Sequence, residues 1–143
     1  MALDFKKTFG YNKTKADEGM WVEIGHGASI KVAKIGTVAY QNVMIKHTRK
    51  YQAQFRVNRY TAETTIDIAA ATLADCILLD WKGIQEDGQE IKYSRANAYR
   101  LLKESEDFRS LVEMYGNDGD LFQDNIIDIG EDEKNLPITS NGT

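Results

Sequence analysis

The sequence predicts a mainly α-helical α+β fold: an N-terminal β-hairpin followed by about five helices, with a short ribbon near residues 82–93. Residues 20–35 are rich in β-branched side chains on both sides of a glycine-flanked turn, which is typical of paired strands. Residues 61–79 repeat apolar side chains at three- and four-residue steps, which indicates one face of a helix. The Asp87-Gly88 pair favours a two-residue turn within the ribbon.

Composition divides the chain into three regions. Residues 1–19 are polar and without a sustained period, so we expect a flexible N-terminal arm. Residues 20–129 are expected to form a single globular α-rich domain, and residues 130–143 a flexible acidic tail. Three aromatic side chains of the arm are suited to anchoring it to a neighbour: Phe5, Phe9 and Tyr11.

The predicted β-hairpin has strands at Trp21–Ile24 and Ala28–Ile35. Gly25-His26-Gly27 forms its turn, because glycine tolerates the left-handed backbone that a tight turn requires. A histidine between two glycines is expected to be an exposed turn residue and not a ligand.

Two longer helices follow. The first runs from about Val38 to Gln54 with Thr37 as its N-cap, and the second is expected over Thr61–Leu79. Trp81 lies just beyond that second helix, where its ring is expected to cover the last turn. The second helix carries the strongest apolar stripe of the chain: Ile66, Ala69, Ala70, Leu73, Ile77 and Leu78.

Three shorter helices complete the prediction. Ser94 and Ser105 are each placed to cap a helix, and the glycine-containing segment 116–119 ends the second of these. The last helix is expected over Asp120–Ile129. The apolar faces of the three helices are Ala98, Leu101 and Leu102; Phe108, Leu111, Val112 and Tyr115; Phe122, Ile126 and Ile129.

Composition limits the class of protein. The 143 residues are 42% hydrophobic and 28% charged, as in an average globular domain. No run approaches the roughly 18 apolar residues of a membrane span, and the N-terminus lacks the apolar segment of a signal peptide. We therefore expect no membrane association and a cytoplasmic location. Cys76 permits no internal disulfide and is expected to pack as a small apolar residue.

The net charge of −4 conceals an asymmetry along the chain. Residues 1–60 hold 11 basic and 4 acidic residues, a net of +7, whereas residues 61–143 hold 7 and 18, a net of −11. Such a separation favours head-to-tail association or a charged partner. The alternative, two solvated surfaces of opposite sign, is equally open.

No pattern of catalysis is present. The chain lacks a P-loop, a dinucleotide fingerprint and a nucleophile elbow, so we expect neither an enzyme nor a bound cofactor. His26 and His47 have no partner at metal-ligand spacing. Four carboxylates near the C-terminus do not follow the alternation of a calcium loop, and no metal site is predicted there: Asp118, Asp120, Asp124 and Asp128.

A basic stretch lies between the two long helical patterns. Cationic and aromatic residues alternate over Lys46–Arg59, a composition that can contact phosphate backbones. No nucleic-acid-binding motif accompanies it, and the chain as a whole is acidic. A solvated helix face or a basic docking patch is therefore favoured over nucleic acid.

Three segments resemble the tail assembly chaperones of long-tailed bacteriophages. They are GMWVEIGHGASIKVAKIG at residues 19–36, LLDWKGI at 78–84 and DGQEIKYSRANAYRLL at 87–102. With the helix that follows, the resemblance covers about residues 19–129. Arg95 departs from it, because related chains often carry an acidic residue or proline after the Tyr-Ser pair.

The resemblance implies a mainly helical, non-catalytic protein. Members of this group bind the tape-measure protein and keep it soluble while tail-tube subunits polymerise around it, then leave before the particle is complete. It therefore implies action in the host cytoplasm, with the tape-measure protein as partner and the tail-tube protein as a second candidate. Self-association stays open, as does the alternative of a structural virion subunit, a connector or tail-completion protein. Candidate contact residues outside the helical stripes are Tyr11, Tyr40, Tyr60 and Tyr93.

Overall fold

The computed structural model describes residues 1–126, and the predicted tail at 130–143 lies outside them. The elements, in order, are α1 (Phe5–Phe9), α2 (Lys13–Glu18), β1 (Met20–Gly25), β2 (Ala28–Val32), α3 (Val38–Arg49), α4 (Gln52–Arg56), α5 (Ala62–Cys76), β3 (Leu78–Lys82), β4 (Gln85–Glu86), β5 (Gln89–Glu90), α6 (Arg95–Glu104), α7 (Glu106–Gly116) and the 3₁₀ helix η1 (Gly119–Phe122).

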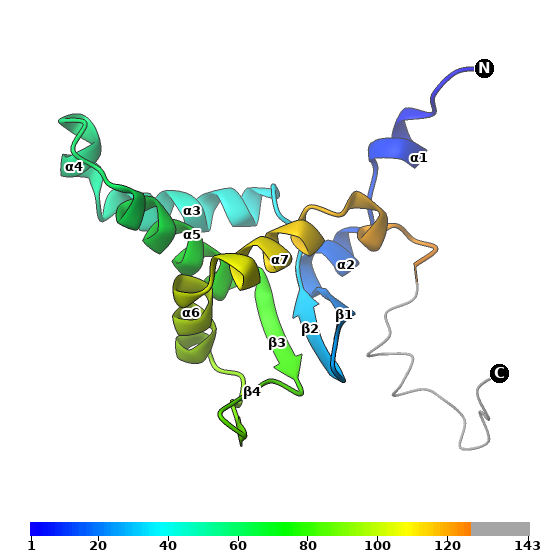
Figure 1. The fold of residues 1–143 in the computed structure, drawn as a ribbon. Helices are drawn as coiled ribbons and strands as arrows, with labels where there is room; N and C mark the ends of the chain where they lie inside the picture. Colours follow the sequence, from blue (N-terminus) through cyan, green and yellow to red (C-terminus); the bar gives the residue numbers. More distant parts are fainter. Residues whose placement is uncertain (127–143) are drawn as a thin grey trace.

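The fold is α+β and mainly helical, as predicted, with a β-hairpin followed by five α-helices (Figure 1). A three-stranded antiparallel sheet has the order β1-β2-β3. Helices α3 and α5 lie against each other, with α4 at their far end; we name these three elements the helical hairpin, and it projects away from the sheet (Figure 1). Helix α5 also packs against α6, and α7 contacts both α5 and β2.

The predicted β-hairpin is confirmed. Its turn has positive φ at both central residues, 54° at the exposed His26 and 76° at Gly27, which suits the right-handed twist of the strands. The second strand ends at Val32 and not at Ile35. Beyond Val32 the backbone hydrogen-bonds to other parts of the chain. The Ala33 amide donates to Ile77 O, and the Ile35 amide donates to Gly116 O.

The helix expected over Thr61–Leu79 ends earlier. The helix begins where predicted, with Thr61 as its N-cap, but α5 stops at Cys76, and Leu78–Lys82 form strand β3. The reason is tertiary: the free edge of β2 offers backbone hydrogen bonds to an extended partner, and residues 78–82 pair with Ser29–Val32. A short apolar run does not distinguish a helical end from a buried strand.

Trp81 therefore lies within a strand and does not sit beyond the end of a helix. Its ring is buried, its Nε1 donates to Ile91 O at 2.7 Å, and the Tyr93 ring meets it edge-on with centroids 5.1 Å apart. The Tyr93 hydroxyl in turn donates to Leu78 O at 2.8 Å. This aromatic pair joins β3 to the segment that leads into α6.

Two other expected helices differ in length. The helix predicted over Val38–Gln54 begins at its predicted cap but divides into α3 and α4, because the chain turns at Tyr51, whose hydroxyl donates to Asp67. Of the helix predicted over Asp120–Ile129, the described residues form only η1, and Gln123 after it adopts extended backbone (φ −77°, ψ 155°). Phe122 is fully buried as predicted, Ile126 is half-buried, and Ile129 lies outside the described residues.

The ribbon and the two serine-capped helices are confirmed. Asp87 and Gly88 have φ of 52° and 78°, the geometry of a two-residue turn between β4 and β5. Ser94 accepts a hydrogen bond from the Asn97 amide at the start of α6, and Ser105 accepts one from the Phe108 amide at the start of α7. Each cap satisfies a backbone donor that the helix itself leaves free.

The first 19 residues contain two short helices. In α2, Ala16 is buried against Met20 and Phe122, and its carbonyl accepts from the Lys34 amide at 3.0 Å. The backbone amide of Asn12 also donates to Phe122 O at 2.7 Å. Helix α1 has no buried residue, and its Phe5 ring is 72% exposed. Among residues 1–126, no helix combines the length and apolarity that crossing a membrane requires.

The main core lies between the sheet and the helices α5, α6 and α7. Leu73 of α5 is 2% exposed at its centre. The other buried members are Val22, Ile30, Val32, Ala33, Ala70, Ala74, Ile77, Leu78, Trp81, Ala98, Leu102 and Val112. Strands and helices thus bury one another's apolar faces, as each element requires.

We expect Leu73→Ala to lower the free energy of unfolding by about 2–5 kcal/mol, because it removes buried methyl groups and leaves a cavity. Leu73→Asp is expected to prevent folding, because it buries an unpaired charge. Urea unfolding followed by circular dichroism measures both. Thr65→Ala, at an exposed position of the same helix, is the control and should change stability by less than about 0.5 kcal/mol. Equal effects at the two positions would contradict the burial of Leu73.

Candidate functional site

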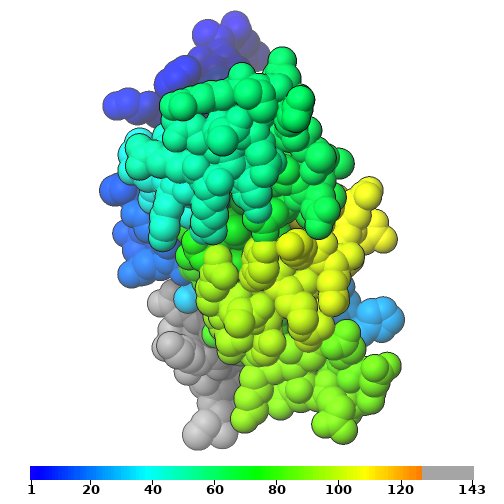
Figure 2. Space-filling model, turned by 90° about the vertical axis from the view of Figure 1, so that its left-hand side faces the viewer, coloured from blue at the N-terminus to red at the C-terminus, as the bar shows by residue number. Residues whose placement is uncertain are grey.

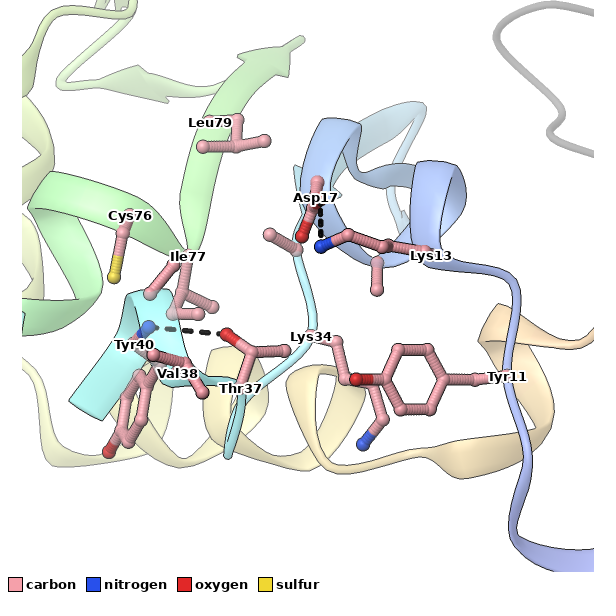
Figure 3. A pocket seen from close by; sticks show the side chains of 13 residues that line it. Tyr11, Lys13, Asp17, Lys34, Thr37, Val38, Tyr40, Cys76, Ile77 and Leu79 are labelled. Atoms are coloured by element: carbon pink, nitrogen blue, oxygen red, sulfur yellow. Dashed lines mark hydrogen bonds and ion pairs between the residues drawn. The ribbon is translucent and has the colours of Figure 1, made fainter. Parts of the chain in front are cut away.

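A hollow lies at the base of the helical hairpin, where four elements and the segments that connect them meet. Its volume is about 410 Å³. The lining residues are Tyr11, Lys13, Ala16, Asp17, Ala33, Lys34, Thr37, Val38, Ala39, Tyr40, Cys76, Ile77 and Leu79 (Figure 3). They come from α2, the segment between β2 and α3, the first turn of α3, the end of α5 and the start of β3.

The hollow combines an apolar floor with a charged margin. Ile77 is buried beneath it, whereas Val38 at its edge is 77% exposed. The Lys34 ammonium lies 5.1 Å from the centre of the Tyr11 ring. Figure 3 shows both side chains at the margin of the hollow. Apolar side chains that no other element covers, beside charged groups that can orient a ligand, are typical of binding surfaces.

A smaller hollow of about 180 Å³ lies on the helical hairpin between α3 and α5. It is lined by Tyr40, Met44, Thr65, Ile68, Ala69 and Thr72. Tyr40 borders both hollows, and we name the two hollows together the apolar groove. Burial raises the pKa of Tyr40, and the nearby Glu113 carboxylate adds to that rise, so its hydroxyl keeps its proton at neutral pH.

Cys76 faces the groove but is not suited to nucleophilic chemistry. Its thiol donates to Thr72 O at 3.4 Å and is half-buried. Burial raises the pKa of this thiol to about 11, with a further contribution from the charge of Asp75. The thiolate is the nucleophilic form, so this cysteine is a weak nucleophile at neutral pH.

A polar cluster lies on another side of α5. Asp75 bridges two helices: its carboxylate oxygens lie 2.5 Å from His47 Nε2 of α3 and 2.5 Å from Arg95 Nε of α6. His47 is buried, and its Nδ1 has no hydrogen-bond partner in residues 1–126. When the proton is on Nε2, the ring donates to Asp75, and Nδ1 is a buried acceptor without a donor among the described residues.

Asp67 repeats this arrangement two turns earlier on α5. It accepts hydrogen bonds from the hydroxyls of Tyr51 and Tyr99, and the Lys103 ammonium lies 3.7 Å away. Because residues four apart share a helix face, His47 and Tyr51 approach α5 from one side and Arg95 and Tyr99 from the other. We name Asp67, Asp75 and their partners the polar ladder; it ties α6 to the helical hairpin.

Both carboxylates of the polar ladder are held ionised. Burial raises the pKa of Asp67, but the hydrogen bonds from Tyr51 and Tyr99 and the positive charge of Lys103 outweigh it, so the pKa falls below its ordinary 3.8. Burial likewise raises the pKa of Asp75, and Arg95 and His47 reverse that effect. These two acids were not predicted from the sequence as residues that hold helices together. Their spacing of eight residues, which places them on one side of a largely apolar helix, was the indication that the sequence offered.

The four tyrosines proposed as partner contacts fall into different settings. Tyr11 and Tyr40 line the apolar groove. Tyr60 is exposed at the far end of the helical hairpin, with its ring 4.7 Å from that of Phe55. Tyr93 instead packs inside the molecule against Trp81. The structure therefore brings two of the four together at one surface.

The carboxylates near the C-terminal end of the described chain have structural roles. Asp118 caps η1 by accepting from the Asp120 amide at 3.1 Å, and Asp124 accepts from Asn12 Nδ2 at 2.8 Å. Asp128 lies outside the described residues. Within residues 1–126, no three His, Cys, Asp or Glu side chains are grouped so that they could hold a metal ion.

We expect Asp67→Asn to lower the free energy of unfolding by about 1–3 kcal/mol at pH 7, because hydrogen bonds to a charged group are lost. The folded-state pKa lies below 3.8, so the carboxylate's contribution is complete above that value and is lost as the pH falls through the folded-state pKa. Urea unfolding between pH 7 and pH 3 measures this. Asp87→Asn, at an exposed turn, is the control. A difference that stays constant with pH would contradict the role of the charge.

Comparison with known proteins identifies the family. A family model described as the YdaY prophage protein matches residues 35–128, about two thirds of the chain. The match spans the helical hairpin, β3, α6 and α7, and therefore the whole polar ladder. No curated protein and no solved structure matches the chain. The chain thus belongs to the YdaY prophage protein family and is of phage origin.

Proposed function

We propose that this protein is a non-enzymatic tail assembly chaperone that binds a phage tape-measure protein and keeps it soluble during tail-tube assembly. Its family membership supports a role in a phage, and the resemblance over residues 19–129 supports the chaperone role. In this proposal it acts in the host cytoplasm and leaves before the particle is complete. The tail-tube protein is a second proposed partner.

The apolar groove is the observation that carries this proposal. A tape-measure protein has long apolar helical stretches, and an amphipathic helix binds by placing its apolar side chains into such a groove. The groove is bordered by Val38, Tyr40 and Met44 of α3 and by Ile68, Ala69 and Thr72 of α5, and apolar side chains of a bound helix would lie against them. Lys13, Asp17 and Lys34 at its margin are placed to fix the orientation of the bound helix.

We expect Val38→Asp to abolish binding of the tape-measure protein without unfolding the chain, because Val38 is largely exposed at the groove's edge. The measurement is the soluble fraction of the tape-measure protein co-expressed with each variant; with Val38→Asp it should fall to the level without the chaperone. Ala96→Asp adds the same charge at an exposed position of α6 outside the groove and should behave as wild type. Equal solubility with both variants would remove the groove from the proposal.

The alternative is a structural virion subunit, favoured by the exposed aromatic rings of α1, which are suited to contact with a neighbour. Peptide mass spectrometry of purified phage particles and of infected-cell lysate separates the two functions. A chaperone is expected to be abundant in the lysate and absent from the particles. Stoichiometric presence in the particles would overturn the chaperone proposal in favour of the structural one.

A further inference from the structure

The far end of the helical hairpin is a concentrated basic surface. Residues 46–60 contain five cationic side chains and no acidic one. All five are exposed, and none lies within ion-pair distance of a carboxylate in the described part of the chain: Lys46, Arg49, Lys50, Arg56 and Arg59. We name residues 46–60 the basic tip; the helical hairpin end that carries it faces the viewer in Figure 2. Lys50 contributes to the lowered pKa of Asp67, and the excess of positive charge on the tip can attract an acidic partner.

The basic tip also carries an apolar centre in a defined conformation. Val57 is 61% exposed, beside the packed rings of Phe55 and Tyr60. Asn58 takes a left-handed backbone, φ 55°, and the Arg59 amide donates to Gln54 O at 2.9 Å, which closes the turn after α4. Aromatic and arginine side chains around an exposed apolar centre are the composition of protein interfaces.

A surface of opposite character lies on α7 and η1. Five carboxylates lie along α7, η1 and the segment between them: Glu106, Asp107, Glu113, Asp118 and Asp120. Glu113 is half-buried, the other four are exposed, and Met114 of the same helix is 55% exposed. The basic residue of α7, Arg109, donates to Leu102 O at 2.8 Å. We name this surface the acidic face; like the basic tip it combines charge with an exposed apolar side chain, but its charge has the opposite sign.

We infer that the basic tip of one copy binds the acidic face of a second copy. The tip lies at the end of the helical hairpin that is remote from the sheet, whereas α7 packs against β2, so one chain cannot join its own two surfaces (Figure 1). The contact joins different surfaces of the two copies. It gives a closed two-fold dimer where the two tip–face contacts form at once, and otherwise a larger ring or an open chain.

Sedimentation velocity of nuclease-treated full-length protein tests this inference at about 25 mM and about 500 mM NaCl, since salt screens exposed charges. We expect the wild type to associate at low salt and to become monomeric at high salt. Arg56→Glu with Arg59→Glu should be monomeric at low salt, and so should Asp107→Lys with Glu113→Lys. Circular dichroism verifies that each variant folds. Lys6→Glu with Lys7→Glu, the same change of charge on the exposed helix α1, should associate as wild type does.

Mixing the two reversed proteins gives the decisive result. An equimolar mixture should regain the association that each reversed protein lacks alone, because the native tip of one matches the native face of the other and their two reversed surfaces also match. A chain carrying all four changes should associate for the same reason. A monomeric wild type at low salt would overturn the inference, as would association that survives in either reversed variant. Retention of nucleic acid that only the tip variant loses, without a change in self-association, would also overturn it and make the tip a nucleic-acid surface.

Discussion

The pairing of β3 with β2 is the interaction on which the rest of the structure depends. The β1–β2 hairpin alone has one open edge at β2, and two strands without a covering layer are marginally stable in water. Strand β3 closes that edge and brings α5 onto the sheet, because only Ile77 separates the helix from the strand. Helices α3, α6 and α7 then pack against α5, so the helical layer is positioned through one strand.

Apolar contacts and polar contacts hold α5 on different sides of the helix. Leu73 and its neighbours bury one side of the helix in the core, while Asp67 and Asp75 bind α3 and α6 through hydrogen bonds and ion pairs. Burial favours compactness without fixing one arrangement, whereas hydrogen bonds require particular distances and angles. The polar ladder thus fixes the register of three helices and leaves the groove side of α3 uncovered.

Local chemistry accounts for what the sequence predicted well. The turns at His26-Gly27 and Asp87-Gly88 and the caps Thr37, Ser94 and Ser105 depend on a few adjacent residues. Strand β3, the division of α3 from α4 and the polar ladder depend on partners distant in the sequence. From the sequence alone, Leu78 and Leu79 continue the helical pattern, because the open edge of β2 that pairs with them is distant in the sequence. Likewise, Asp67 resembles a solvent-exposed acid, because its partners Tyr51 and Tyr99 meet it only in the folded chain. The groove also required the three-dimensional arrangement, since its lining comes from separate elements.

The direct junction between α5 and β3 ties the direction of the helical hairpin to that of the sheet. Ile77 is buried, its amide donates to Leu73 O and its carbonyl accepts from the Ala33 amide, so the one residue between helix and strand is held by both neighbouring elements. Ile77 also lines the apolar groove. The residue that sets the angle between α5 and the sheet is therefore also part of the surface proposed to bind a partner.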